Sequence, residues 1–335
     1  MKRILLTILA LQAAVFAGAQ QDVQFSQNRF LNTSVNPGAA GIRGVDCFGL
    51  TLRQQWIGFE GRPTTGMLTY EKALPQYNMG VGGVLVFDQI GLESSVFFKA
   101  NGAYHLTLSN GAKLGLGLDI GIINKQISGD FIAGVMTDPD LAPLLGGSQS
   151  SINVDLGVGA FYYTPELYFG ISGQKLIPQK VAWGSVQPQI RPHTYFVGGY
   201  NYVLPNPDFT LKPSFLVKTD FTATQVDVNL IVDYKTKVWA GASYRIQDAI
   251  VFMAGYSIEN VLPNPLKIGL AYDFTTQNLR KPGDFEYPID AQGNVQPTKQ
   301  NNRSYGAVEL NIRYCFIAPV KPPYGEYIDP LFGNN

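Results

Sequence analysis

Hydrophobic and polar residues alternate along most of this chain. In 113–123 (KLGLGLDIGII), leucine or isoleucine fills every second position, with glycine or aspartate in most of the places between them. The same pattern recurs in 152–163, 225–234 and 309–316. A period of two places successive side chains on opposite faces of an extended strand. The pattern therefore predicts a protein built almost entirely from β-strands.

The alternating segments are about ten residues long, the length that a tilted strand needs to cross a hydrocarbon core. Their polar faces are rich in Gly, Asn, Asp and Ser, with few Lys or Glu. A large soluble β-sandwich would also alternate, but its outer faces would carry many charges. We therefore predict an all-β fold, a transmembrane antiparallel outer-membrane β-barrel of about fourteen strands. The expected strands lie near 44–54, 65–73, 79–88, 94–108, 112–127, 151–163, 166–175, 193–204, 208–219, 224–234, 237–247, 250–258, 265–275 and 305–316.

Aromatic residues and the need for closure support a barrel. Many tyrosines fall near strand ends, where the aromatic girdles of membrane barrels lie. Closure removes the unpaired strand edges that lipid does not tolerate. The tyrosines concerned are Tyr162, Tyr163, Tyr168, Tyr200, Tyr202, Tyr234, Tyr244, Tyr256 and Tyr272.

The connections between strands predict an orientation. Those after even-numbered strands are short and rich in Pro, Asn and Gly, whereas the long ones, 128–150, 176–192 and 276–304, all follow odd-numbered strands. Bacterial barrels keep short turns on the periplasmic side. We therefore expect a bacterial outer-membrane location with both mature termini in the periplasm.

The ends of the chain predict export and two flanking segments. Lys2 and Arg3 precede an apolar run that closes with Ala-Gly-Ala, which is typical of a signal peptide over 1–19. Residues 20–43 form a polar N-terminal segment that either plugs the barrel or lies at its periplasmic rim, although a disordered tail is the plain alternative. We expect the barrel over 44–316 and a periplasmic C-terminal tail over 317–335.

Composition excludes several functions. The formal net charge is zero, so nothing suggests nucleic acid. His105 and His193 are the only histidines, and no spacing pairs them with a nucleophile, so we expect no enzyme activity. We expect no cofactor and no metal either, because Asp130 and 138–140 lack the ligand spacing of a calcium loop.

The two cysteines leave an alternative open. Cys47 and Cys315 lie near the two ends of the chain, which a closed sheet would bring together. They either form a disulfide or are two half-buried small residues. We favour the second interpretation, and spacing alone does not decide it.

One outer connection has an unusual composition. Residues 53–65 (RQQWIGFEGRPTT) combine charges, amides and large aromatic side chains in the first connection on the outer side. Together with 24–27 (QFSQ), 36–41 (NPGAAG), 80–91 (GVGGVLVFDQIG) and 308–316 (VELNIRYCF), this segment resembles the PorP/SprF family of outer-membrane proteins of the type IX secretion and gliding machinery. The resemblance spans nearly the whole mature chain. One departure is Val308, where several relatives place a histidine before the glutamate.

The resemblance implies a role in secretion and in attaching cargo to the cell surface. The implied partners are a secreted surface protein with a type-B C-terminal sorting domain, such as a gliding adhesin, and other type IX components in the outer membrane and periplasm. We hypothesise that the outer segment docks cargo or braces the lumen below it, because Trp and Arg are favoured interface anchors. The candidate residues are Arg53, Gln54, Gln55, Trp56, Phe59, Glu60 and Arg62.

Two alternatives remain at this stage. The outer segment could be a structural constriction, with Arg53 and Arg62 neutralised by lumen carboxylates such as Asp88 and Glu93. The whole protein could instead be a FadL-like transporter or a porin for small solutes, since fourteen strands can enclose a lumen. The polar inward faces count against a transporter of hydrophobic solutes.

Overall fold

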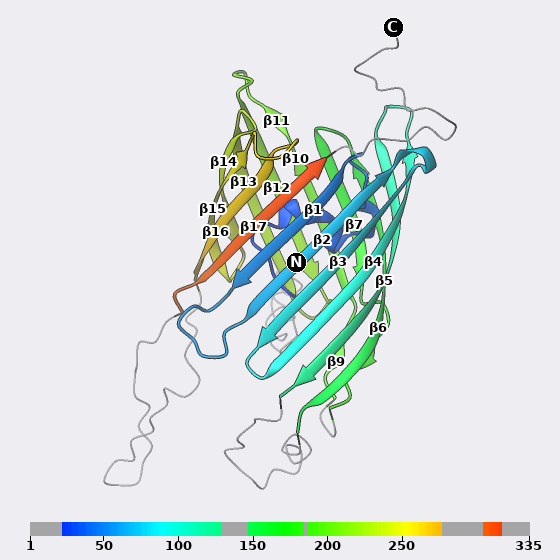
Figure 1. Ribbon diagram of the computed structural model, residues 1–335, viewed down its shortest axis with the longest axis vertical. Helices are drawn as coiled ribbons and strands as arrows, with labels where there is room; N and C mark the ends of the chain where they lie inside the picture. The colour runs from blue at the N-terminus through cyan, green and yellow to red at the C-terminus, as the bar shows by residue number, and fades with distance from the viewer. Residues whose placement is uncertain (1–21, 129–146, 184–186, 277–303, 317–335) are drawn as a thin grey trace, which may run out of the picture.

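The protein is a closed antiparallel β-barrel (Figure 1). The structure, a computed structural model, describes residues 22–128, 147–183, 187–276 and 304–316. The expected signal peptide, the expected C-terminal tail and the acidic 138–140 lie outside these ranges. Within the described ranges, no helix has both the length and the apolar character needed to cross a bilayer.

Fourteen long strands form the wall, as the alternation predicted. The wall strands are β1 (Asp46–Gln54), β2 (Thr64–Leu74), β3 (Met79–Ile90), β4 (Glu93–Thr107), β5 (Lys113–Ile127), β6 (Gln149–Tyr163), β7 (Leu167–Gln174), β10 (His193–Tyr200), β12 (Phe209–Thr219), β13 (Thr224–Tyr234), β14 (Val238–Arg245), β15 (Ala249–Ile258), β16 (Leu266–Thr275) and β17 (Ala307–Phe316). Two short pieces, β8 (Gln179–Lys180) and β9 (Gln189–Ile190), pair with each other, and β11 (Tyr202–Val203) pairs with β12.

Two pairings close the ring. One joins the first and last strands, and the other joins two strands that are separated in the chain by the short β11. β1 pairs with β17 from Asp46↔Phe316 to Gln54↔Val308. β10 pairs with β12 from Thr194↔Thr219 to Gly199↔Ser214, so that β11 does not interrupt the wall. Every wall strand therefore has two hydrogen-bonded neighbours, which leaves no sheet edge to be satisfied in lipid.

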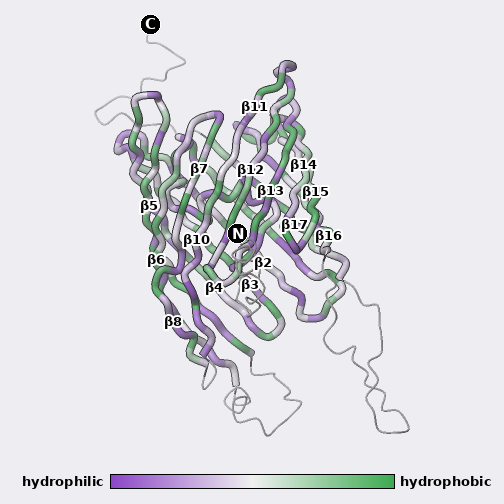
Figure 2. Tube along the Cα trace, turned by 180° about the vertical axis from the view of Figure 1, so that it is seen from behind, coloured by the Kyte–Doolittle hydropathy of each residue, from purple (hydrophilic) through white to green (hydrophobic). Residues whose placement is uncertain are grey.

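The predicted assignment of faces is confirmed. In β5, Leu118 is 67% exposed on the outside of the isolated barrel, whereas its neighbour Asp119 is 3% exposed. Hydrophobic stretches recur along the barrel wall in Figure 2. Tyr168 departs from the expected aromatic girdle, because it is buried against Phe161, with the two ring centroids 5.7 Å apart. The outer surface is thus apolar and the lumen polar, as an outer-membrane barrel requires.

The two ends of the barrel differ in their connections. The turn between β2 and β3 spans 75–78 and that between β13 and β14 spans 235–237, whereas β5 and β6 are separated by 128–148. The short turns share one end, here called the short-turn end, with the start of β1 and the end of β17. The opposite end, called the long-connection end, carries the 55–63 loop.

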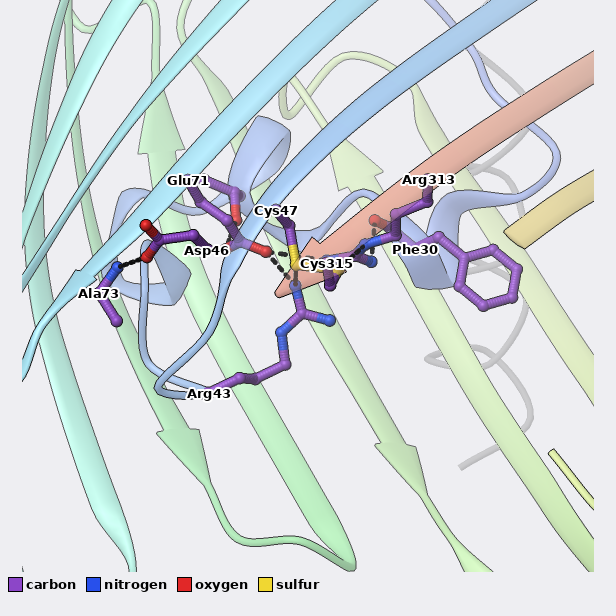
Figure 3. Close-up of a disulfide and its surroundings, with 9 residues drawn as sticks. Phe30, Arg43, Asp46, Cys47, Glu71, Ala73, Arg313 and Cys315 are labelled. Atoms are coloured by element: carbon purple, nitrogen blue, oxygen red, sulfur yellow. Dashed lines mark hydrogen bonds and ion pairs between the residues drawn. A yellow bond between two sulfur atoms is a disulfide. The ribbon is translucent and has the colours of Figure 1, made fainter. Parts of the chain in front are cut away.

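The cysteines form a disulfide, so the expectation of two unpaired residues is wrong. Cys47 and Cys315 lie directly opposite each other in the β1–β17 register, with their Cα atoms 4.1 Å apart and their sulfurs bonded (Figure 3). Closure of the barrel brings together these two residues, which are 268 positions apart in the sequence. The bond joins the first and last strands near the short-turn end.

We predict that the double variant Cys47→Ser/Cys315→Ser still closes its barrel, because the other β1–β17 pairs remain. Its free energy of unfolding should fall by about 2–4 kcal/mol, since the disulfide restricts the unfolded chain. Urea unfolding followed by the heat-dependent shift in gel mobility measures this change. Wild-type protein in reducing agent should behave like the variant, and an unchanged urea midpoint would contradict the prediction.

Candidate functional site

Residues 22–44, here called the luminal segment, run through the interior of the barrel. The segment contains three single turns of helix, η1 (Asn28–Phe30), α2 (Asn32–Val35) and η2 (Pro37–Ala39). These helical turns, drawn in dark blue, are seen behind the front strands of the barrel in Figure 1. The side chains and backbone of the segment bond to inward-facing residues around much of the wall. The interior of this barrel is therefore occupied by its own chain.

The luminal segment begins near the long-connection end. Asp22 accepts hydrogen bonds from Lys175 Nζ (2.9 Å) and Tyr195 Oη (2.5 Å), and its carbonyl accepts one from Lys218 Nζ (2.9 Å). Burial would raise the pKa of the Asp22 carboxyl, but Lys175, His193 and Lys218 together hold it below its usual range. Hydrogen bonds from three residues at this end of the barrel thus hold the start of the segment.

The expectation that both mature termini lie in the periplasm stays a prediction, because residues 20, 21 and 317–335 lie outside the described ranges. The even strand count does put the start of β1 and the end of β17 together. However, the luminal segment runs along the barrel before β1 begins, so Asp22 lies towards the opposite end from Asp46.

Glu309 binds the backbone of the luminal segment. Its two carboxylate oxygens accept hydrogen bonds from the backbone N–H groups of Ser26 (2.6 Å) and Gln27 (2.8 Å). One of them also receives Arg53 Nη1 at 3.2 Å. Arg53 and Glu309 face each other directly in the β1–β17 register. One carboxylate therefore joins the segment to the seam that closes the barrel.

A network of buried charges extends from this point. Asp273 on β16 accepts from Arg53 (2.7 Å) and from Arg245 on β14 (2.9 Å), and Arg245 also contacts Asp227 on β13 (3.3 Å). The Ser26 hydroxyl donates to Asp273 at 2.7 Å and accepts from both arginines. Burying charge is favourable only where partners and hydrogen bonds compensate for lost water. Five strands and the luminal segment supply those partners together.

On the other side of the lumen, the luminal segment packs against glycine residues of the wall. The Asn36 side chain, fully buried, donates to the carbonyls of Ala160 and Ile171 (both 3.0 Å) and accepts from Gly38 N (2.9 Å). It thereby caps η2, which starts with proline. The N-P-G sequence is thus explained by one short turn that inserts its amide between β6 and β7.

Glycines on the inward face admit the backbone of this turn. A Cβ atom at Gly117 would lie 2.3 Å from the nitrogen of Gly38, and one at Gly115 would lie 2.1 Å from the carbonyl oxygen of Gly38. On β3, a Cβ at Gly80 would lie 2.1 Å from the Ala40 carbonyl oxygen. No side chain fits at such distances. The glycine alternation of these strands therefore forms a close-contact surface for the segment.

The candidate residues of the outer loop separate into two groups. Arg53 and Phe59 are buried, the first within the charge network. Gln54 and Gln55 are half-buried, while Trp56, Glu60 and Arg62 are exposed at the long-connection end. The structure thus places all seven in one loop and its flank, but brings only some of them to the surface.

The carboxylates proposed to neutralise these arginines were named wrongly. Asp88 accepts a hydrogen bond from Thr65, and Glu93 pairs with Lys125. Arg53 instead pairs with Asp273 and Glu309, because barrel closure brings β17 beside β1. Arg62 lies beside the Gln54 amide, whose oxygen accepts from it at 2.8 Å when the amide is turned towards it.

Sequence reasoning missed Arg245, Asp273 and the role of Glu309. Each lies on the inward face of a strand, where Gly, Asn and Ser are the usual residues. A charged residue at such a position is the signal that could have identified them. His105 and His193 have structural contacts: one ring nitrogen of each lies 2.9 Å from a backbone carbonyl, that of Ala40 or Arg191. Among the described residues, no three His, Cys, Asp or Glu side chains are grouped to hold a metal.

The fold and its outward apolar face define an outer-membrane β-barrel. Residues 17–288 match the family model described as "Type IX secretion system membrane protein PorP/SprF". The match covers well over half of the chain. The chain therefore belongs to the PorP/SprF family of type IX secretion system membrane proteins.

Several solved structures are similar to this chain at low sequence identity. The outer-membrane protein Omp33 of Acinetobacter baumannii aligns at 8% identity over 81% of this chain and 99% of its own, with a TM-score of 0.44. The toluene transporter TodX of P. putida aligns at 11% identity over 84% and 93%, with a TM-score of 0.47. The KdgM porin aligns at 9% identity over 81% and 99%, with a TM-score of 0.38. No curated protein matches this chain.

We predict that Glu309→Gln loosens the luminal segment. The amide offers one acceptor oxygen in place of two and leaves Arg53 with less compensating charge, and breaking a buried pair costs about 3–5 kcal/mol. The midpoint of thermal unfolding should fall, and backbone amides of 24–28 should exchange faster with deuterium. Glu259→Gln is the control, because Glu259 pairs with Lys237 at an exposed turn. Equal exchange at 24–28 in the two variants would contradict the role of Glu309.

A second variant tests the glycine surface. We expect Gly117→Ala to displace residues 36–39 while the barrel stays closed, since the added methyl group overlaps the Gly38 backbone. Gly102→Ala on the adjacent β4 is the matched control, because nothing lies within 4 Å of a Cβ there. Limited proteolysis of the folded barrel measures the result. Cleavage within the luminal segment should appear in the first variant only, and an uncut segment in both would contradict the expectation.

Proposed function

We propose that this protein retains a secreted cargo at the cell surface, by docking a surface protein with a type-B C-terminal sorting domain at the long-connection end. The observation that carries the proposal is the ordered 55–63 loop, which presents Trp56 outward in a member of a type IX secretion family. Other secretion components in the outer membrane and periplasm are the partners that family membership implies.

Contacts with two neighbouring connections support a preformed docking loop. Ile57 N donates to the Gly306 carbonyl (3.0 Å), and Tyr305 N donates to the Ile57 carbonyl (2.9 Å). On the other side, Gly91 N donates to the Gly61 carbonyl at 2.8 Å. A loop already held in its binding conformation loses less entropy on association.

The conformation of Trp56 supports a functional role for the loop. Trp56 has φ +51°, a left-handed conformation that is rare for a bulky residue, and its side chain is 38% exposed. Strain of this kind is concentrated at functional sites. The exposed ring of Tyr305 lies on the segment that is bonded to the loop. Trp56, Tyr305 and Arg62 are of the three residue types that are enriched among interface anchors.

Within this proposal the buried members of the motif have a supporting role. Phe59 N donates to the Trp56 carbonyl at 3.0 Å, and the Phe59 ring turns inward. Arg53, the last but one residue of β1, lies within the charge network, three residues before the exposed Trp56. The two hypotheses made from the sequence are therefore compatible: Trp56, Glu60 and Arg62 dock cargo, while Arg53 and Phe59 brace the loop.

Transport of small solutes is the weaker alternative. The luminal segment occupies the interior, and the inward faces near it carry charged or glycine residues. No geometric feature of the described residues favours an apolar solute inside the barrel.

The test is Trp56→Ala in cells, with mass spectrometry of the cell surface and of the culture medium. We expect the retained cargo to fall by roughly tenfold at the surface and to appear in the medium, since a hot-spot aromatic contributes 2 kcal/mol or more. Phe221→Ala is the matched control: Phe221 is 82% exposed in another connection of the same end and has a similar φ of +63°.

The folded state is checked by the heat-dependent gel shift of each variant. Cargo that stays on the surface of cells with folded Trp56→Ala protein would contradict the docking proposal. Complete deletion of the protein sets the reference. Loss of a few surface proteins would support a dedicated partner, retention of all type IX cargo inside the cell would indicate a core component, and reduced uptake of a solute alone would favour transport.

A further inference from the structure

A cavity of about 450 Å³ lies at the short-turn end, between the luminal segment and the wall. The segment forms its inner side through residues such as Phe30 and Ile42, and inward-facing residues of β2, β12, β16 and β17 form its walls. Thr236 and Glu259 come from short turns, so the cavity reaches the end of the barrel. Its volume lies within the range of ordinary ligand sites. It is at the opposite end from the proposed cargo-docking loop and does not depend on that proposal.

Positive charge dominates the lining of this cavity. Two carboxylates, Glu71 and Glu259, face five cationic side chains, which leaves a balance of 5 − 2 = +3. Two partners lie outside the lining: Lys237 pairs with Glu259, and Asp233 pairs with Lys212. Including both gives six cations and three carboxylates, so the net charge is again +3. The five cations are Arg29, Arg43, Lys212, Lys267 and Arg313.

Internal ion pairs do not neutralise this charge. Glu71 is shared between Arg43 and Arg313 (2.8 Å from the latter), beside the disulfide (Figure 3). Among the described residues, the polar partners of Arg29 are neutral: the Asn201 amide oxygen (2.5 Å), the Pro213 carbonyl (3.3 Å) and the face of the Tyr168 ring. Lys267 forms no ion pair with any described residue.

Two of the cations are placed directly opposite each other. Lys267 on β16 and Arg313 on β17 are register partners, and like charges in that position are destabilising. Glu71 pairs with Arg313 but not with Lys267, so an anion bound in the cavity would reduce the repulsion that remains. Because the cavity is enclosed by the wall, lipid headgroups in the surrounding bilayer do not reach it from the side. An anion must enter through the short-turn end.

We propose that this cavity binds an acidic segment of polypeptide from a protein on that side of the membrane. The cations are distributed over three strands and the luminal segment rather than converging on one point, which fits several carboxylates spaced along a chain. Phe30, Tyr163 and Tyr168 line the same cavity and offer contact area for apolar side chains. A free Lys267 ammonium and the shared arginines supply the charge-assisted hydrogen bonds.

The probe is fluorescein-labelled hexaglutamate, added to the full-length protein in nanodiscs, with binding followed by fluorescence anisotropy. We expect saturable binding that weakens as salt is raised, because the attraction is electrostatic. Lys267→Gln should weaken binding roughly tenfold, the usual effect of losing one charge-assisted hydrogen bond. Lys267→Glu should weaken it further. A labelled Gly-Ser peptide of equal length should not bind.

Lys235→Gln is the matched control, because Lys235 lies at a turn of the same end, exposed and outside the cavity. Lys267 forms no ion pair with a described residue, so its variants should keep the heat-dependent gel shift of the folded barrel. Equal affinities of Lys267→Gln and Lys235→Gln would overturn the proposal. Complete displacement of hexaglutamate by inorganic phosphate at equal charge would also overturn it, since the cavity would then be a small-anion site.

Discussion

The carboxylate of Glu309 is the contact on which the interior of this protein depends. A closed ring of fourteen strands encloses more space than its own inward side chains fill, and this chain occupies that space with irregular backbone. Such backbone needs partners for its N–H and C=O groups away from bulk water. Glu309 accepts two of those N–H groups and one arginine at the seam between the first and last strands. Barrel closure and the position of the luminal segment are therefore specified at the same place.

The two sides of the lumen hold the segment by different physical means. Around β13 to β17 the contacts are charged, and Ser26 lies among Arg53, Arg245 and Asp273. Around β3 to β7 the contact is steric, because the wall lacks side chains where the Asn36–Gly41 backbone approaches it. Charges give strong but adaptable contacts, while close packing of backbone on glycine fixes position. Their combination explains why a barrel with so few charges places several of them in its interior.

Local pattern predicted the wall because the two faces of each strand meet different surroundings. A register slip of one residue in β5 would move Leu118 into the lumen and Asp119 into lipid, so the alternation alone determines which residues face inward. The long-range contacts could not be predicted from local pattern. Arg53 and Glu309 are 256 residues apart, and Cys47 meets Cys315 only in the register that closes the ring. The path of the luminal segment was equally hidden, since it depends on where glycines from four strands gather.

The contacts of the luminal segment favour a fixed brace over a gate. A gate requires a second arrangement of comparable free energy. Withdrawal of the segment would expose Glu309 without its two backbone donors and would leave the glycine surface of β5 without its packing partner. It would also remove Arg29 and Arg43 from the cavity at the short-turn end. The same segment contributes to the charge network below the outer loop and to the cavity at the other end. We therefore infer that it keeps the two ends of the barrel in a fixed arrangement.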